Sequence, residues 1–104
     1  MAIKLASGQK WHEYVDGVRI QMAPLTTRDL RKIYKEAKGD DETFEELIAD
    51  HVLLDWEGIV GEDDLKLPVT LASKMAIRDN VALSAWIDSK SKGFTTVKDA
   101  ELKN

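Results

Sequence analysis

The residues best suited to chemistry are His51 and Asp55, which lie four positions apart in a stretch that the pattern predicts to be helical. Side chains at this spacing meet on one helix face, so the carboxylate could orient the imidazole as a general base. Such a base activates a nucleophile, but the chain has no cysteine and no G-x-S-x-G motif. A small hydrolase using His51 and Asp55 is therefore a remote alternative. An ion pair or a contact between subunits is the favoured interpretation.

The spacing of the other candidate ligands does not indicate metal or phosphate chemistry. His12 and His51 are 39 positions apart, and no H-E-x-x-H motif is present. The acidic residues around Asp55–Asp64 do not match the calcium-loop pattern, and Gly58–Gly61 is not followed by the Gly-Lys-Ser/Thr of a phosphate loop. We therefore predict no metal, no cofactor and no catalytic residue.

Composition indicates one domain with its own hydrophobic core. The chain has 104 residues, of which 43% are hydrophobic, and it contains no cysteine to form disulfides. No apolar stretch approaches the ~20 residues of a membrane span, and the first residues do not read as a signal peptide. We expect a cytoplasmic protein with no membrane partner.

Charge is distributed unevenly along the chain. Residues 1–38 carry a net charge of +4, residues 39–68 carry eleven acids against Lys66 alone, and the remainder carries +2. The favoured interpretation is solvated helix faces. The alternative is a bipolar molecule that stacks head to tail or docks a basic partner helix. We expect no nucleic-acid partner, because the acidic part would repel phosphate.

A β-hairpin is predicted over residues 10–22. Asp16-Gly17 separates two runs that favour strands, and this dipeptide is typical of a two-residue hairpin turn because both turn positions need positive φ. A lone hairpin is marginally stable in water, so its apolar face must pack on other elements. The turn predicts three cross-strand pairs: Val15 with Val18, Glu13 with Ile20, and Trp11 with Met22.

Three helices are predicted after the hairpin, over residues 27–38, 42–57 and 71–91. Thr26 and Asp29 form a capping box at the start of the first helix, and Gly39 ends it. The second helix begins in acidic residues, and Gly58 is placed at its C-terminal cap.

Thr70 caps the third helix, whose apolar arc is interrupted near Asp79-Asn80, so we predict a kink or a restart there. Residues 1–93 are predicted to form a single globular domain, and residues 94–104 a flexible tail. The fold class is α+β and predominantly helical, with the N-terminal hairpin packed against three or four helices.

The end of the second predicted helix is apolar nearly all round, which indicates burial on more than one side. Aromatic residues are enriched where proteins bind one another, so Trp56 is our first choice for an exposed anchor. The predicted partner-binding residues are Leu53, Trp56, Ile59 and Val60.

Two short motifs carry a resemblance to a known family. The first runs from Leu54 to Ile59 and matches D-W-x-G-(I/V), and the second runs from Leu67 to Thr70 and matches L-P-(V/F)-(T/S). With the acidic glycine turn between them and the hairpin before them, residues 18–94 resemble the small tail assembly chaperones of long-tailed bacteriophages. The turn departs from the family, reading Gly-Glu-Asp-Asp-Leu instead of Asp-x-Asp-Gly.

The resemblance implies a non-enzymatic role in the cytoplasm of a bacterial host cell. Such proteins coat the long helical tape-measure protein and keep it soluble until the tail tube polymerises around it. The implied partner is therefore a tape-measure or other tail protein, and we also expect weak homo-oligomers. The alternative function is a small structural or adaptor protein of the tail or neck that stays in the particle.

Overall fold

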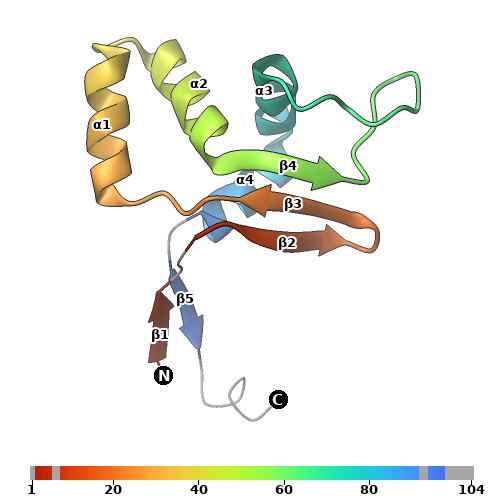
Figure 1. Cartoon of the computed structure of the whole chain (residues 1–104), viewed down its shortest axis with the longest axis horizontal. Helices are drawn as coiled ribbons and strands as arrows, with labels where there is room; N and C mark the ends of the chain where they lie inside the picture. Colours follow the sequence, from red (N-terminus) through yellow and green to blue (C-terminus); the bar gives the residue numbers. More distant parts are fainter. Residues whose placement is uncertain (1, 6–7, 92–93, 98–104) are drawn as a thin grey trace.

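The fold combines a three-stranded antiparallel sheet with helices, in a computed structural model that describes residues 2–5, 8–91 and 94–97 (Figure 1). In chain order the elements are β1 (Ala2–Leu5), β2 (Lys10–Val15), β3 (Val18–Met22), α1 (Thr27–Ala37), α2 (Asp41–Val52), β4 (Leu53–Glu57), α3 (Leu71–Asp79), α4 (Val81–Lys90) and β5 (Phe94–Val97). The sheet order is β2-β3-β4, and β1 pairs with β5 in a separate two-stranded ribbon. The predicted α+β class is confirmed.

The hairpin lies where the sequence predicts it, but of its two turn residues Gly17 alone has a positive φ, and its register is wrong beyond the turn. Val15 lies opposite Val18 as expected, and an irregularity between Glu13 and Val15 then shifts the pairing by one residue. The extra residue is Tyr14, whose ring makes an edge-to-face contact with Trp86 of α4 at a centroid distance of 5.0 Å. A bulge of this kind re-aims a side chain at the expense of one ladder position.

The shift exchanges the two faces of β2. His12, rather than Glu13, now lies opposite Ile20, and Trp11 moves away from the core because successive side chains alternate between faces. Trp11 is consequently 37% exposed, and the guanidinium carbon of Arg19 lies 4.5 Å from the centroid of its ring. Burial and two lysines, Lys90 and Lys10, lower the pKa of His12 below its ordinary value.

The second predicted helix is wrong at its end, because α2 stops at Val52 and the chain continues as strand β4. Trp56 pairs with Ile20 and Leu53 with Met22, and the register changes between these pairs. Leu53 and Trp56 are three residues apart and would face opposite sides of a regular strand. The irregularity turns both into the core, where neither is exposed.

The core lies between the sheet and the helices. Its fully packed members come from β3, β4 and three helices: Ile20, Met22, Val52, Leu53, Trp56, Ile77 and Ile87. In the part of the chain that the structure describes, no helix combines the length and the apolar character needed to cross a membrane.

Two helix boundaries confirm the sequence analysis. The hydroxyl oxygen of Thr26 accepts the N–H of Asp29 at 3.1 Å, and the Asp29 carboxylate accepts the N–H of Thr26 at 3.0 Å, which completes the capping box of α1. Asn80 separates α3 from α4, and its side-chain oxygen accepts the N–H of Leu83 at 3.0 Å. The predicted restart near Asp79-Asn80 is therefore present.

The predicted tail is wrong for its first residues. Phe94–Val97 forms β5, which pairs antiparallel with β1 so that Phe94 lies opposite Leu5 and Val97 opposite Ala2. Residues 98–104 of the predicted tail lie outside the described residues. The ribbon of β1 and β5 extends below the three-stranded sheet in Figure 1.

Gly58 ends β4 rather than capping a helix. Its φ is +81°, a conformation that L side chains rarely adopt, and a Cβ atom at this position would overlap the carbonyl oxygen of Gly17 in the hairpin turn. The close approach of these two backbones is possible because residue 58 has no side chain. It brings the turn of the hairpin against the end of β4.

We expect Gly58→Ala to destabilise the protein more than Gly39→Ala, which is its matched control. Gly39 has a similar φ of +83°, but a Cβ there would meet nothing within 4 Å. The control should therefore lose about 1 kcal/mol from backbone strain alone, and Gly58→Ala should lose about 2–3 kcal/mol because the hairpin turn must also move. Urea unfolding measures both losses. Equal losses would show that the turn moves freely.

A second expectation concerns acid stability. The N–H of Thr26 is the main cause that lowers the pKa of the Asp29 carboxyl below its ordinary value, with a smaller contribution from His51. A carboxyl with a lowered folded pKa contributes stability above its unfolded pKa, and this contribution is lost as the pH falls through the folded pKa. The advantage of wild type over Asp29→Asn should therefore be present at about pH 6 and disappear between about pH 4 and pH 2.

Urea unfolding at several pH values measures this advantage. Glu36→Gln removes a carboxylate from the same helix but outside the capping box, so it serves as the control. An advantage that persists unchanged at about pH 2 would contradict the assignment, since the protonated Asp29 carboxyl no longer carries its charge.

Candidate functional site

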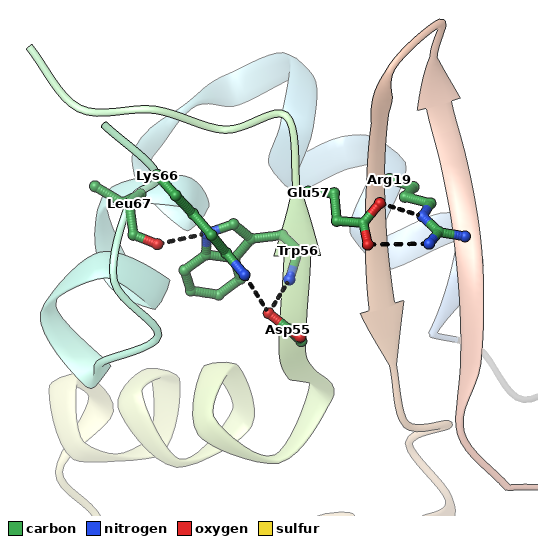
Figure 2. A network of polar contacts seen from close by, with 6 residues as sticks. All are labelled: Arg19, Asp55, Trp56, Glu57, Lys66 and Leu67. Carbon is green, nitrogen blue, oxygen red and sulfur yellow. Dashed lines mark hydrogen bonds and ion pairs between the residues drawn. The ribbon is translucent and has the colours of Figure 1, made fainter. Parts of the chain in front are cut away.

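The loop that joins β4 to α3, residues 58–70, is fixed to the core by Trp56. The indole of Trp56 is fully buried, and its Nε1–H donates a hydrogen bond to the carbonyl oxygen of Leu67 at 2.9 Å (Figure 2). Within the loop the N–H of Leu67 donates to the carbonyl oxygen of Ile59, and the N–H of Gly61 donates to that of Leu65, both at 3.0 Å. The β4–α3 loop is therefore a small antiparallel turn rather than an irregular connection.

Charged side chains add a second attachment at the exposed side of β4. One carboxylate oxygen of Asp55 accepts the N–H of Trp56 at 2.7 Å and the ammonium of Lys66 at 3.1 Å (Figure 2). The N–H of Trp56 is the main cause, and Lys66 the second, that lowers the pKa of the Asp55 carboxyl below its ordinary value. Lys66 thereby links the far side of the loop to the strand.

A bidentate ion pair holds β4 to its neighbour strand. The guanidinium of Arg19 donates to both carboxylate oxygens of Glu57, at 2.8 and 3.0 Å (Figure 2). Both side chains are about half exposed, and exposed pairs contribute little to stability. Their contribution is orientation, because the fork geometry fixes the end of β4 from which the loop departs.

The loop holds apolar side chains in solvent. Four of them, from the loop and the first residue of α3, are between 42% and 68% exposed: Val60, Leu65, Val69 and Leu71. The acids Glu62, Asp63 and Asp64 lie beside them at the tip and are also exposed. Exposed apolar side chains with charged neighbours are typical of protein–protein contact sites. The loop also lines a shallow open hollow from Gly61 to Pro68.

The structure corrects half of the predicted partner-binding set. Leu53 and Trp56 are completely buried, so Trp56 is not an exposed anchor, and the prediction of its exposure is wrong. Ile59 is half-buried and packs against the core, whereas Val60 is 52% exposed. The apolar end of the predicted helix is buried because this segment is strand β4, whose apolar side chains pack into the core.

Sequence reasoning missed the exposed apolar residues that follow Val60. Leu65 lies directly after the acidic cluster, and Val69 and Leu71 flank the helix cap Thr70. Their neighbours are turn-forming and helix-capping residues, which predict the backbone conformation but not the exposure of the apolar side chains. The available signal was apolar residues inside a segment whose neighbours are charged or turn-forming.

The structure does not bring His51 and Asp55 together. The Nε2 of His51 lies 3.2 Å from the carbonyl oxygen of Pro24 and 3.3 Å from a carboxylate oxygen of Asp29. Asp55 instead contacts Lys66. The helix ends at Val52, so residues 51 and 55 do not lie on one helix face. Among the described side chains, no group of three or more His, Asp or Glu residues is placed to hold a metal ion.

We expect Trp56→Phe to cost about 2–3 kcal/mol of unfolding free energy. The substitution leaves a cavity in the core and removes the donor that satisfies the Leu67 carbonyl oxygen. Trp11→Phe is the matched control and should cost less than about 1 kcal/mol, because the Trp11 ring is partly exposed and Phe retains an aromatic face for Arg19. Urea unfolding compares the two variants. A similar loss in both would contradict the special role of Trp56.

Comparison with known proteins places the chain in a phage setting. A family model described as YdaY prophage protein matches residues 8–104, which include the sheet, the helices α1–α4 and the whole β4–α3 loop. No curated protein and no solved structure matches the chain.

Proposed function

The chain belongs to the YdaY prophage protein family, and from this premise we propose that it is a non-enzymatic tail assembly chaperone. Its partner in this proposal is the tape-measure protein of the same prophage, which it keeps soluble until the tail tube forms. The observation that carries the proposal is the set of apolar side chains that the β4–α3 loop holds in solvent. The family match supports the prophage setting, and the two motifs of the resemblance support the finer role.

Most of the motif residues hold the proposed binding surface in place, and one of them, Val69, is exposed on it. In the first motif, Trp56 anchors the loop and Gly58 allows β4 to end against the hairpin turn. In the second, Leu67 supplies the acceptor for the indole, and Thr70 caps α3 through the N–H of Ser73. Chains that share these motifs have the means to build the same loop and to present variable side chains from it.

The exposed residues suit a long helical partner. A helix binds a protein surface through apolar side chains on one face, and the apolar residues of the β4–α3 loop offer complementary contacts. The acids at the loop tip border these contacts, and a charged border keeps an apolar surface from associating indiscriminately. A non-enzymatic role fits the separate positions of His51 and Asp55.

The test is co-expression with the tape-measure protein of the same prophage. Wild type should raise the soluble fraction of that protein and co-purify with it. Val60→Asp/Val69→Asp should weaken binding at least about tenfold, which corresponds to about 1.4 kcal/mol, because both apolar contacts become charged. The control is Val81→Asp, a valine that is 84% exposed at the start of α4, and it should bind like wild type.

Two outcomes would contradict the proposal. The first is wild type that neither binds the tape-measure protein nor changes its solubility. The second is equal loss of binding in the control, which would remove the loop as the site. Recovery of the chain from purified phage particles would instead favour the alternative, a structural or adaptor protein of the tail or neck.

A further inference from the structure

The outer face of α1 is a stripe of positive charge. Its members recur at the i, i+3, i+4 and i+7 positions and continue at the C-terminal cap: Arg28, Arg31, Lys32, Lys35 and Lys38, here called the basic stripe. All five are exposed, and at 3.6 residues per turn they lie opposite Ile33 and Ala37, which are buried. Among the described residues none of the five has an ion-pair partner.

The basic stripe is unfavourable for an isolated helix. Like charges three and four residues apart repel, and the stripe contains several such pairs and no acid. The two acids of the helix relieve it only in part, because Asp29 serves the capping box and Glu36, four residues after Lys32, borders only one edge of the stripe. A negatively charged partner on this face would remove the repulsion.

A negatively charged surface of this kind lies on the same molecule, at the end of the long axis opposite α1. Glu62, Asp63 and Asp64 form the exposed tip of the β4–α3 loop, and in the described part of the chain none of them makes an ion pair. Figure 1 places α1 and this loop at opposite ends of the longest axis, which measures 42 Å. The tip therefore faces away from the basic stripe of its own chain and is free to meet that of another.

The acids at the start of α2 are less suited to this contact. Asp40 caps the helix by accepting the N–H of Glu42 at 3.1 Å and the hydroxyl of Thr43 at 2.9 Å. Asp41 and Glu42 lie in the first turn, where negative charge offsets the positive end of the helix dipole. The loop tip has no comparable role apart from the bond of Asp63 to the N–H of Leu65.

We propose that a second copy of this chain docks the acidic tip of its β4–α3 loop on the basic stripe, so that copies associate head to tail. Because two different surfaces meet, a pair of copies keeps one free stripe on one copy and one free tip on the other, and association can continue into a ring or a filament. One helix face and one loop tip form a contact below the standard size of stable interfaces, so the association is weak and sensitive to salt. Val60 and Val69 take no part in this contact, which is independent of the tape-measure proposal.

The test is sedimentation velocity of the full chain with two charge-reversed variants. One is Arg31→Glu/Lys35→Glu in the basic stripe, and the other is Glu62→Lys/Asp64→Lys at the loop tip. At about 50 mM salt each should associate at least about tenfold more weakly than wild type, because like charges then face each other. An equimolar mixture should regain association, since each variant offers the other a surface of opposite charge.

The control for the stripe variant is Lys10→Glu/Lys90→Glu, which makes the same change in net charge as that variant but at exposed lysines outside the stripe. It should associate like wild type, and circular dichroism should show that every variant is folded. Wild type that stays monomeric at low salt, either reversed variant that associates like wild type, or a mixture that does not recover would each overturn the proposal. Monomeric wild type that binds double-stranded DNA through the stripe would overturn it in favour of a nucleic-acid surface.

Loss of self-association leaves the proposed chaperone function separately measurable. The Val60→Asp/Val69→Asp variant should retain head-to-tail association while it loses the tape-measure protein. The stripe variant should show the opposite pattern. Loss of both properties in both variants would contradict the assignment of two separate surfaces.

Discussion

The structure depends on the burial of one indole and on the hydrogen bond that its ring nitrogen donates. Trp56 lies opposite Ile20 on the inner face of the sheet, and its Nε1–H reaches the Leu67 carbonyl oxygen eleven residues further along the chain. A buried N–H without an acceptor is costly, so the ring and the loop determine each other's position. This contact joins the core to the segment that carries the exposed apolar side chains.

That constraint explains how a small protein keeps apolar side chains in solvent without losing order. The β4–α3 loop is closed by its own backbone hydrogen bonds, by Lys66 on Asp55 and by the indole of Trp56. Ordering the loop in advance lowers the entropy that binding would otherwise cost. The basic stripe of α1 lies at the other end of the long axis, whereas the acidic tip that it would meet belongs to the same loop as the exposed apolar side chains.

Local sequence signals were sufficient for the elements whose ends are decided by nearby residues. The capping box of Thr26 and Asp29, the turn at Asp16-Gly17 and the helix restart at Asn80 each depend on bonds within a few positions. For the candidate site, the segment around Val60 was predicted, but Leu53 and Trp56 were assigned to its surface when they belong to the core. A short apolar run is compatible with a buried helix end and with a buried strand, and periodicity does not distinguish them.

The sequence by itself determined the fold class, the hairpin, the helix caps at Thr26 and Thr70 and the bipolar distribution of charge, because each of these follows from composition or from contacts between near neighbours. Only the tertiary structure decided that the chain after Val52 is a strand, since the free edge of β3 supplies the hydrogen-bond partners that favour it. The bulge at Tyr14 likewise accompanies a contact with Trp86, which is remote in the sequence. Which apolar residues are buried and which face solvent follows from these long-range pairings.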